Sequence, residues 1–341
     1  MAMGKRVFIV ILCKTLFIDN LVAQEIHFSQ FYANPLTANP AQTAFYDGNV
    51  RANGMYRTQW KAIDNTPYQT VSVSLEKQMH LSDHTYGFGL LALHDESGYA
   101  NLNVDKLLAS SAFCLNVDGH SLSLGLQLGL VYKSTNTDKY TYDEQYDFGG
   151  DEVFNRDFAS GELGDEPIFH AAINAGVEWR KQLTYNYVAN VGVSMFNINT
   201  PYESFYGVEL ENTQQALRVA MQVGGDYTIN NNKLYFHPNV LYMMQKHATD
   251  FLLGGNLEYV LQPQLHIYGG TLFRYGWEKN YDASVWIVGA KYKRFDIGLS
   301  YDINLSSLHK ATNCRGAFEV SVTYLSPTWK STKVKIPCER I

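Results

Sequence analysis

The sequence predicts an all-β protein, an antiparallel transmembrane β-barrel of about 14 strands with short periplasmic turns and long extracellular loops. Two observations support this prediction. Apolar and polar residues alternate along many segments, and the connections between those segments alternate between short and long. In addition, no apolar run reaches the ~18 residues that a membrane-spanning helix needs. A chain that crosses a membrane with strands therefore fits better than one that crosses with helices.

The composition excludes several other classes of protein. The chain has 341 residues, of which 46% are hydrophobic, 14% aromatic and 18% charged, and its formal net charge is -6. Such an aromatic chain has enough apolar surface to fold, which excludes a disordered protein. The negative net charge disfavours a nucleic-acid binder, so no nucleic-acid partner is expected.

Residues 1–23 have the pattern of a secretory signal peptide. Lys5 and Arg6 precede an apolar stretch, and Ala23 is the predicted cleavage position. A lipoprotein signal at Cys13 is the alternative, but it requires a small residue where Leu12 stands. The sequence therefore predicts an exported protein.

Residues 24–47 differ from the rest of the mature chain. They contain two Asn-Pro dipeptides and several aromatic residues but show no alternation, so they predict an ordered segment that is not a strand. This segment is expected either to plug the lumen of the barrel or to lie against its periplasmic rim. Residues 48–325 are expected to form the barrel, and the basic tail at 326–341 to stay in the periplasm.

The clearest strand signal lies in residues 121–133, where a leucine occupies every second position from Leu122 to Leu130. This period of two places the leucines on one face of a strand and small or polar residues on the other. Similar segments lie near residues 48–60, 68–77, 84–94, 100–115, 121–133, 168–180, 186–197, 214–228, 233–245, 250–260, 264–274, 283–292, 295–302 and 316–325. A count of twelve or sixteen strands stays open, because strand ends are uncertain by a few residues.

The connections between these segments fall into two sets. The short set comprises residues 78–83, 117–120, 181–184, 230–232, 262–264 and 293–294. The other set includes the much longer connections 134–167, 199–213, 275–282 and 303–315. Outer-membrane barrels sort their connections in this way, with short turns in the periplasm and long loops outside. A soluble β-sandwich has no reason to do so.

Several short stretches of the mature chain are typical of one known family. They are HFSQFYANP at 27–35, NPA at 39–41, YRTQW at 56–60 with Pro67-Tyr68, HPN at 237–239, GLSYD at 298–302 and PCER at 337–340. With these stretches, in this order and spacing, the chain resembles the PorP/SprF family of type IX secretion system membrane proteins from Bacteroidetes. The resemblance spans nearly the whole mature chain.

The resemblance implies an outer-membrane barrel that is accessory to the type IX system. Its implied partners are periplasmic components of that system and a secreted type IX cargo protein, such as a gliding adhesin, held through its C-terminal domain. Composition and periodicity alone indicate only an exported barrel in outer-membrane lipid. They leave a passive channel or a hydrophobic-solute transporter as the alternative function.

Charged residues at alternate positions of three predicted strands predict a polar lumen. A charge that faces lipid at the middle of a bilayer costs about 2–4 kcal/mol, so these side chains are expected to point inward. They are Arg51, Arg57, Glu178, Arg180, Arg218 and Asp226. Our interpretation is a network of ion pairs that fills the barrel, and the alternative is a path for a solute.

Two of the long loops combine acidic and aromatic residues, a composition typical of protein recognition surfaces. We expect their aromatic side chains to contact a partner. These residues are Tyr140, Tyr142, Tyr146, Phe148, Phe154, Tyr202, Phe205 and Tyr206.

No cofactor, metal site or enzyme activity is predicted. The acidic residues of the longest loop lack the spacing of a known calcium loop, so a solvated acidic loop is the preferred interpretation. The sequence also lacks a metal-spaced histidine pair and a nucleophile elbow. His94 with Asp95, and His247 with Asp250, are the remaining candidates for a catalytic dyad.

Overall fold

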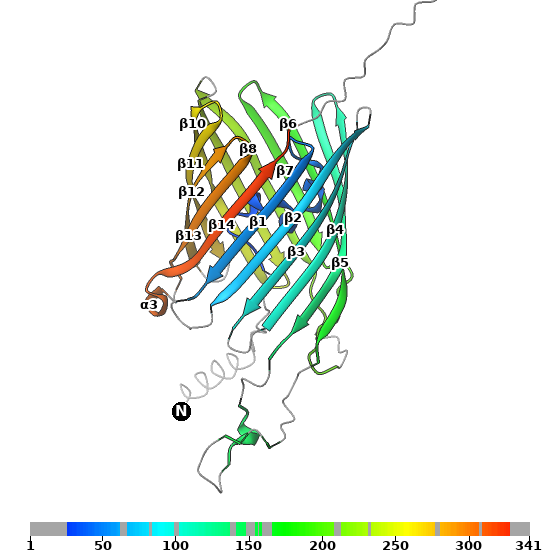
Figure 1. The fold of residues 1–341 in the computed structure, drawn as a ribbon, viewed down its shortest axis with the longest axis vertical. Helices are drawn as coiled ribbons and strands as arrows, with labels where there is room; N and C mark the ends of the chain where they lie inside the picture. The colour runs from blue at the N-terminus through cyan, green and yellow to red at the C-terminus, as the bar shows by residue number, and fades with distance from the viewer. Residues whose placement is uncertain are drawn as a thin grey trace, which may run out of the picture.

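The computed structural model describes residues 26–61, 67–81, 84–98, 102–136, 141–147, 154–155, 157–158, 166–207, 213–230, 233–276, 280–306 and 309–327. These residues form one closed antiparallel barrel in which each strand pairs with its neighbours in sequence and β14 pairs with β1 (Figure 1). The strands are β1 (Val50–Gln59), β2 (Tyr68–Leu81), β3 (His84–Ser97), β4 (Leu102–Val117), β5 (His120–Ser134), β6 (Ile168–Thr184), β7 (Tyr187–Phe196), β8 (Arg218–Asn230), β9 (Leu234–Gln245), β10 (Ala248–Gln262), β11 (Leu265–Gly276), β12 (Asn280–Tyr292), β13 (Phe295–Asn304) and β14 (Arg315–Leu325).

The predicted barrel and its fourteen strands are confirmed, and each strand coincides with one predicted segment. The differences lie at the strand ends. Residues 78–81 and 181–184 were expected in the short connections, yet they belong to β2 and β6. Ladder hydrogen bonds use only the backbone, so pairing continues beyond the apolar part of each strand. As a result β2 to β6 have 14 to 17 residues and form the tall side of the barrel.

The two ends of the barrel differ in their connections. At one end, here called the short-turn end, tight turns join β2 to β3, β4 to β5 and so on to β13. In one of them Asp118 and Gly119 have φ angles of 48° and 75°, as a two-residue type I′ turn requires. The other end, here called the long-loop end, carries the connections 135–167 and 197–217 (Figure 1). The sorting by length is incomplete, because Lys246 and His247 alone join β9 to β10 at the long-loop end.

The outer wall of the barrel is apolar. On β5, alternate residues from Leu122 to Leu130 face outward with 37–49% of their surface exposed, whereas Ser123 and Gln127 between them are fully buried inside. Large apolar side chains exposed in this pattern over a whole wall are what lipid contact requires. The period of two in the sequence therefore corresponds to the two faces of the wall.

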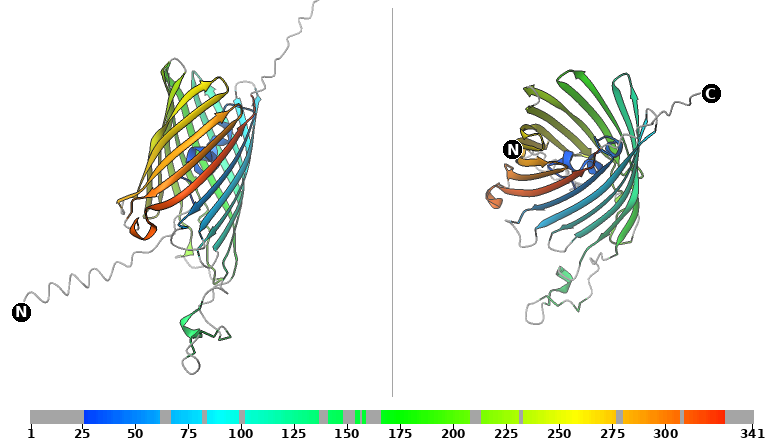
Figure 2. Two further views of the ribbon diagram at one scale, coloured as in Figure 1. Left: turned by 60° about the vertical axis from the view of Figure 1, so that its left-hand side comes forward. Right: turned by 45° about the horizontal axis from the view of Figure 1, so that its top comes forward.

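Residues 26–46, here called the plug, lie inside the barrel (Figure 2). They form three short helices, η1 (Phe31–Ala33), α2 (Pro35–Ala38) and η2 (Pro40–Ala44). Two more short helices, η4 (Asp143–Gln145) and α3 (His309–Thr312), lie in connections at the long-loop end. No helix among the described residues is long and apolar enough to cross a membrane.

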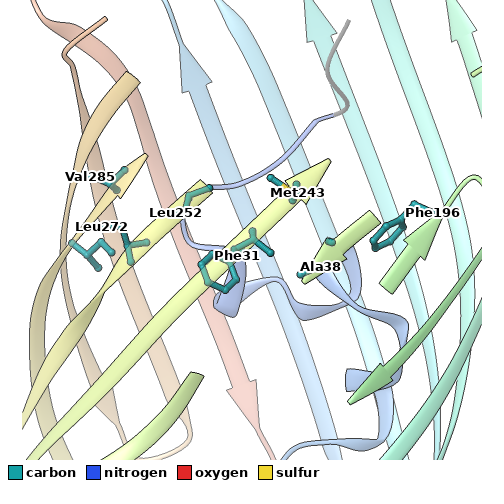
Figure 3. Packing of buried hydrophobic residues seen from close by; sticks show 10 residues of the cluster. Phe31, Ala38, Phe196, Met243, Leu252, Leu272 and Val285 are labelled. Atoms are coloured by element: carbon teal, nitrogen blue, oxygen red, sulfur yellow. The ribbon is translucent and has the colours of Figure 1, made fainter. Parts of the chain in front are cut away.

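The plug packs on the wall through two apolar clusters. Leu36, which is fully buried, contacts Leu91 and Leu108 of the tall side. Phe31 and Ala38 lie in a second cluster with residues of β7 to β12, among them Leu252 and Leu272 (Figure 3). The hydrophobic core of the protein thus lies between the plug and the inner wall, and not between two layers of secondary structure.

Candidate functional site

The start of the plug is bound by a carboxylate of the last strand. Glu319 on β14 is fully buried, and its two oxygens accept hydrogen bonds from the backbone N–H groups of Ser29 (2.7 Å) and Gln30 (3.0 Å). The side chain of Gln30 completes the contact by donating to Ser300 (3.1 Å) and accepting from Ser321 (3.0 Å). A carboxylate that accepts two backbone N–H groups makes strong charge-assisted hydrogen bonds, so Glu319 fixes this part of the plug.

A buried ion cluster surrounds the same point. Arg57 donates to Glu319, and Arg274 donates to Asp302 at 2.8 Å. The hydroxyl of Ser29 joins both arginines to Asp302, since it accepts from Arg57 (3.0 Å) and Arg274 (3.1 Å) and donates to Asp302 (3.0 Å). Each of these charged side chains is at most 6% exposed. Opposite charges in direct contact are what makes burial of four ionised groups tolerable.

The middle of the plug is held by polar side chains of the tall side and of β7. Asn39 donates to Glu178 (3.0 Å), and Asn190 donates to the other oxygen of Glu178 (3.0 Å). Ser123 and Ser194 donate to backbone carbonyls of the plug, each at 2.7 Å. These side chains satisfy backbone and amide groups that would otherwise be buried without partners.

Glycines on the inner wall leave the space that the plug occupies. A Cβ atom at Gly125 would lie 2.3 Å from the backbone of Pro40 and Ala41, and one at Gly87 would lie 2.4 Å from the carbonyl oxygen of Thr43. A Cβ at Gly176 would lie 2.0 Å from Asn39. No real Cβ contact is this short, so any side chain at these positions displaces the plug.

The six charged residues predicted to face the lumen all have inward positions on their strands. Arg51 forms a bidentate pair with Glu76 (2.6 and 2.8 Å) and also donates to the plug carbonyl of Gln42. Arg180 pairs with Asp226 at 3.3 Å, which joins β6 to β8. The network therefore links each charge either to a nearby strand or to the plug.

Two of the six residues also contact groups other than an opposite charge. Glu178 accepts hydrogen bonds from the amides Asn39 and Asn190, and not from an arginine. Arg218 stacks on the ring of Phe196, with its guanidinium carbon 4.1 Å from the ring centroid. Sequence alternation identified the face of these residues but not their partners.

Several residues of the network were missed by the sequence analysis. Glu76, Asp302 and Glu319 are all fully buried. The signal that identifies Glu76 was available, since it continues the polar series Thr70, Ser72, Ser74 between the apolar residues of β2. For Asp302 and Glu319 the same alternation predicts the face but not the contact with Ser29, which is more than 270 residues away in sequence.

A polar cavity of about 280 Å³ remains between the plug and the wall at the short-turn end. On its wall His237 bridges Asp226 (2.7 Å) and Glu258 (3.1 Å), and Glu258 also contacts Lys291 and His266, each at 2.6 Å. Acidic and basic groups alternate around this cavity, which suits water and is unfavourable for a hydrocarbon.

At the long-loop end, the connection after β7 is fastened to the tall side. Glu203 contacts Lys133 of β5 (2.7 Å) and His170 of β6 (2.9 Å). Burial alone raises the pKa of Glu203, but the hydrogen bonds and charges of His170 and Lys133 outweigh it and hold this pKa below its usual value. The backbone of Glu166, at the base of the longest loop, also donates to the carbonyl of Phe205 (3.2 Å). The two predicted partner-binding loops therefore lie side by side.

The predicted partner-binding aromatics lie in these two loops. Tyr202 and Tyr206 are 39% and 60% exposed, and Phe205 is half-buried. In the longest loop Tyr146 pairs with Phe154, with ring centroids 5.2 Å apart, and Tyr142 precedes η4. Tyr140 and Phe148 lie outside the described residues. The described members thus lie in two loops at the long-loop end of the molecule.

The catalytic dyad His94 with Asp95 does not form. Adjacent residues of a strand point to opposite faces, so His94 faces outward while Asp95 faces the lumen, where it accepts from Thr70 at 2.6 Å. Within the described ranges, no group of three or more His, Cys, Asp or Glu side chains is arranged so that it could hold a metal ion.

Taken together, the geometry defines a class of protein: a membrane β-barrel that holds its own N-terminal segment in the lumen and carries aromatic residues in the loops at one end. The sequence matches a family model described as type IX secretion system membrane protein PorP/SprF over residues 20–324. The chain belongs to this family, and the resemblance is confirmed. It is an outer-membrane component of the type IX secretion system and not an enzyme.

The fold is also similar to that of solved outer-membrane barrels. The toluene transporter TodX of Pseudomonas putida is 13% identical, with a TM-score of 0.52, and the match covers 89% of this chain and 98% of TodX. A structure described as the CymD monoaromatic hydrocarbon channel is 12% identical, with a TM-score of 0.50, and the match covers 87% and 93% of the two chains. At such low identity the likeness concerns the fold alone. No curated protein sequence gives a significant match.

Proposed function

We propose that this barrel anchors or helps to secrete a type IX cargo protein, such as an adhesin, by binding its C-terminal domain at the long-loop end. In this proposal the long-loop end faces the outside of the cell. The short-turn end, with the start of β1 and the end of β14, faces the periplasmic components of the secretion system. Residues 1–23 act as the signal peptide that exports the chain, and residues 326–341 stay in the periplasm.

The observation that supports this role most directly is the filled lumen. The plug carries fully buried residues such as Leu36 and Gln30, and buried hydrogen bonds, among them those to Glu319 and Ser300, join it to the wall. A barrel filled in this way is suited to holding a partner without opening the membrane. The polar lining of the remaining cavity also argues against a path for hydrophobic solutes.

The second supporting observation is the fastened loop surface. Glu203 holds the loop that carries Tyr202 and Tyr206 against two strands, so these rings are presented at a fixed place. A pre-ordered aromatic surface loses little conformational entropy on binding, which favours affinity. The acidic residues around it favour a cargo domain with a basic face.

The proposal is tested by capture of the cargo with a tagged barrel in which Tyr202 and Tyr206 are both replaced by alanine. Exposed aromatics at the centre of an interface commonly contribute more than ~1 kcal/mol each, so we expect capture to weaken about tenfold or more. The matched control is Tyr185→Ala, which removes a tyrosine that is 91% exposed at the short-turn end. If cargo capture weakens equally in both variants, or weakens in neither, the assignment of the loop surface is contradicted.

The alternative, a passive channel, is tested with the same purified protein in planar bilayers. The filled lumen predicts no steady conductance. Conductance that is unaffected by the partner would contradict the sealed barrel and favour the channel.

A further inference from the structure

A shallow apolar groove of about 330 Å³ lies on the outer wall of the tall side, across β2 to β6. Its floor is formed where Ala92, a small residue, stands between the larger Val73 and Leu107 on the neighbouring strands. The other outward residues of this wall are mostly bulky, such as Leu90 and Leu128. The groove is therefore a local dent in a surface that faces lipid.

The register of the strands arranges the lining of the groove in two rows. The row nearer the middle of the wall is apolar, with Val73, Ala92, Leu107 and Leu130 paired in sequence across four strands. The row nearer the long-loop end is mixed. It consists of Val71, His94, Asp105, Tyr132 and Phe169, paired in the same way. The groove thus has an apolar end toward the membrane interior and a polar end toward the membrane surface.

The polar end carries an ion pair that faces outward. Nδ1 of His94 lies 2.7 Å from Oδ1 of Asp105, and the two side chains are 51% and 53% exposed. The ion pairs described above face the lumen, whereas this one faces the region of the lipid head groups. A charge on the lipid side is tolerated near the interface, where its cost falls to about 0–1 kcal/mol, but not at mid-bilayer. Tyr132 and Phe169 in the same row are consistent with that level.

We propose that this groove binds one membrane lipid with a phosphoethanolamine head group. Its acyl chain lies in the apolar row, against Ala92. Because Nδ1 of His94 is directed at Asp105, Nε2 is left to donate to a phosphate oxygen when the ring is protonated. The second oxygen of Asp105 accepts from the primary ammonium. With the ring protonated, the two groups 2.7 Å apart carry opposite charges and match a head group that has a phosphate and an amine close together.

Other lipid head groups fit this pair less well. A phosphatidylglycerol head group supplies the phosphate but no positive charge, so Asp105 meets only neutral glycerol hydroxyls in place of an ammonium. A phosphatidylcholine head group has the same charges as phosphoethanolamine, but its methylated amine has no N–H to donate to Asp105. The comparison between the amine and its methylated form therefore isolates the contact with Asp105.

The inference concerns the wall of the barrel and goes beyond the proposed cargo role at the loops. Its failure would leave the cargo proposal standing, and the reverse also holds.

The test is native mass spectrometry of the full-length barrel, purified in detergent and incubated with an equimolar mixture of phosphatidylethanolamine, phosphatidylglycerol and phosphatidylcholine with identical acyl chains. We expect phosphatidylethanolamine to be retained about three- to fivefold over phosphatidylcholine, the ratio that a half-exposed charged contact of up to ~1 kcal/mol supports. Asp105→Asn should abolish this preference. His94→Gln should lower retention of all three phospholipids, and Ala92→Trp, which fills the groove, should do the same.

The matched control is Glu96→Gln, which neutralises an outward carboxylate on β3 two residues beyond His94 and outside the groove lining. It should retain the preference of the wild type. These surface substitutions leave the lumen untouched, and heat-dependent mobility on gels confirms the folded barrel. Equal retention of the amine and its methylated form by the wild type would overturn the proposal and indicate ordinary surrounding lipid. Preferential retention of phosphatidylglycerol, raised further by Asp105→Asn, would overturn it in favour of a simple anion site.

Discussion

A single methyl group at Gly125 should loosen the plug. The Cβ atom of Gly125→Ala would lie 2.3 Å from the backbone of Pro40 and Ala41, so either the plug or β5 has to move. Overpacking of this kind costs about 1–3 kcal/mol, and here it destabilises the state in which the plug is packed on the wall. The control is Gly54→Ala on β1, where an added Cβ meets nothing within 4 Å. There alanine should instead stabilise the strand by about 0.5–1 kcal/mol.

A native thiol reports on the position of the plug. Cys114 faces the lumen beneath Ala44 and is only 4% exposed while the plug is seated. With Cys314→Ser and Cys338→Ser as background, a maleimide reagent labels Cys114 only when the plug moves away. Labelling requires that the plug first moves away from Cys114. If Gly125→Ala destabilises the seated plug by about 1–3 kcal/mol, the labelling rate therefore rises about 5- to 150-fold.

The folded state in each variant is checked by heat-dependent mobility before labelling. The expected result is fast labelling of Gly125→Ala, with wild-type rates for Gly54→Ala. If Gly125→Ala labels as slowly as the wild type, the contact between the plug and β5 does not hold the plug in place.

Two further predictions concern single carboxylates. Glu319→Gln should lower the free energy of unfolding by about 3 kcal/mol, because it breaks a buried pair with Arg57 and weakens the hold on the plug; urea unfolding that matches the wild type would contradict this. The pKa of Glu203 in the folded protein lies below its usual value. Ionised Glu203 therefore stabilises the loop fully at any pH above the pKa of an unfolded-state glutamate. This stabilisation is lost only as the pH falls through the lowered pKa of the folded state. Limited proteolysis in the connection 197–217 should therefore become fast in the wild type only at a pH below the usual titration range of glutamate, whereas in Glu203→Gln it should be fast at all pH values.

The barrel was predictable because its strands obey a local rule. Every second residue of β5 from Leu122 to Leu130 is a leucine, and lipid on one side of the wall is the physical reason. The prediction of about fourteen strands and the inward face of residues such as Arg51 rest on that alternation, and the structure decides between fourteen strands and the counts of twelve or sixteen. Strand ends such as Gln78–Leu81 were not predicted, since backbone pairing does not depend on the type of side chain.

The plug contacts could not be read from the sequence. Asn39 meets Glu178 and Gly176 from β6, and Ser29 meets Glu319 from β14, so each contact depends on how the closed barrel brings distant strands together. Likewise, the sequence analysis paired His94 with its neighbour Asp95, whereas the strand register pairs it with Asp105. Registers between strands are set by turns and by the whole sheet, which a local pattern does not contain.

The central claim, that the long-loop end holds a type IX cargo, is tested most directly by isolating the tagged barrel from its native outer membrane in mild detergent. Mass spectrometry then identifies the proteins that remain bound. The account predicts a large secreted protein in near-equal amount, attached through its C-terminal domain and lost when residues 136–166 are deleted from an otherwise folded barrel. Recovery of the barrel alone, or capture that is unchanged by the deletion, would contradict it.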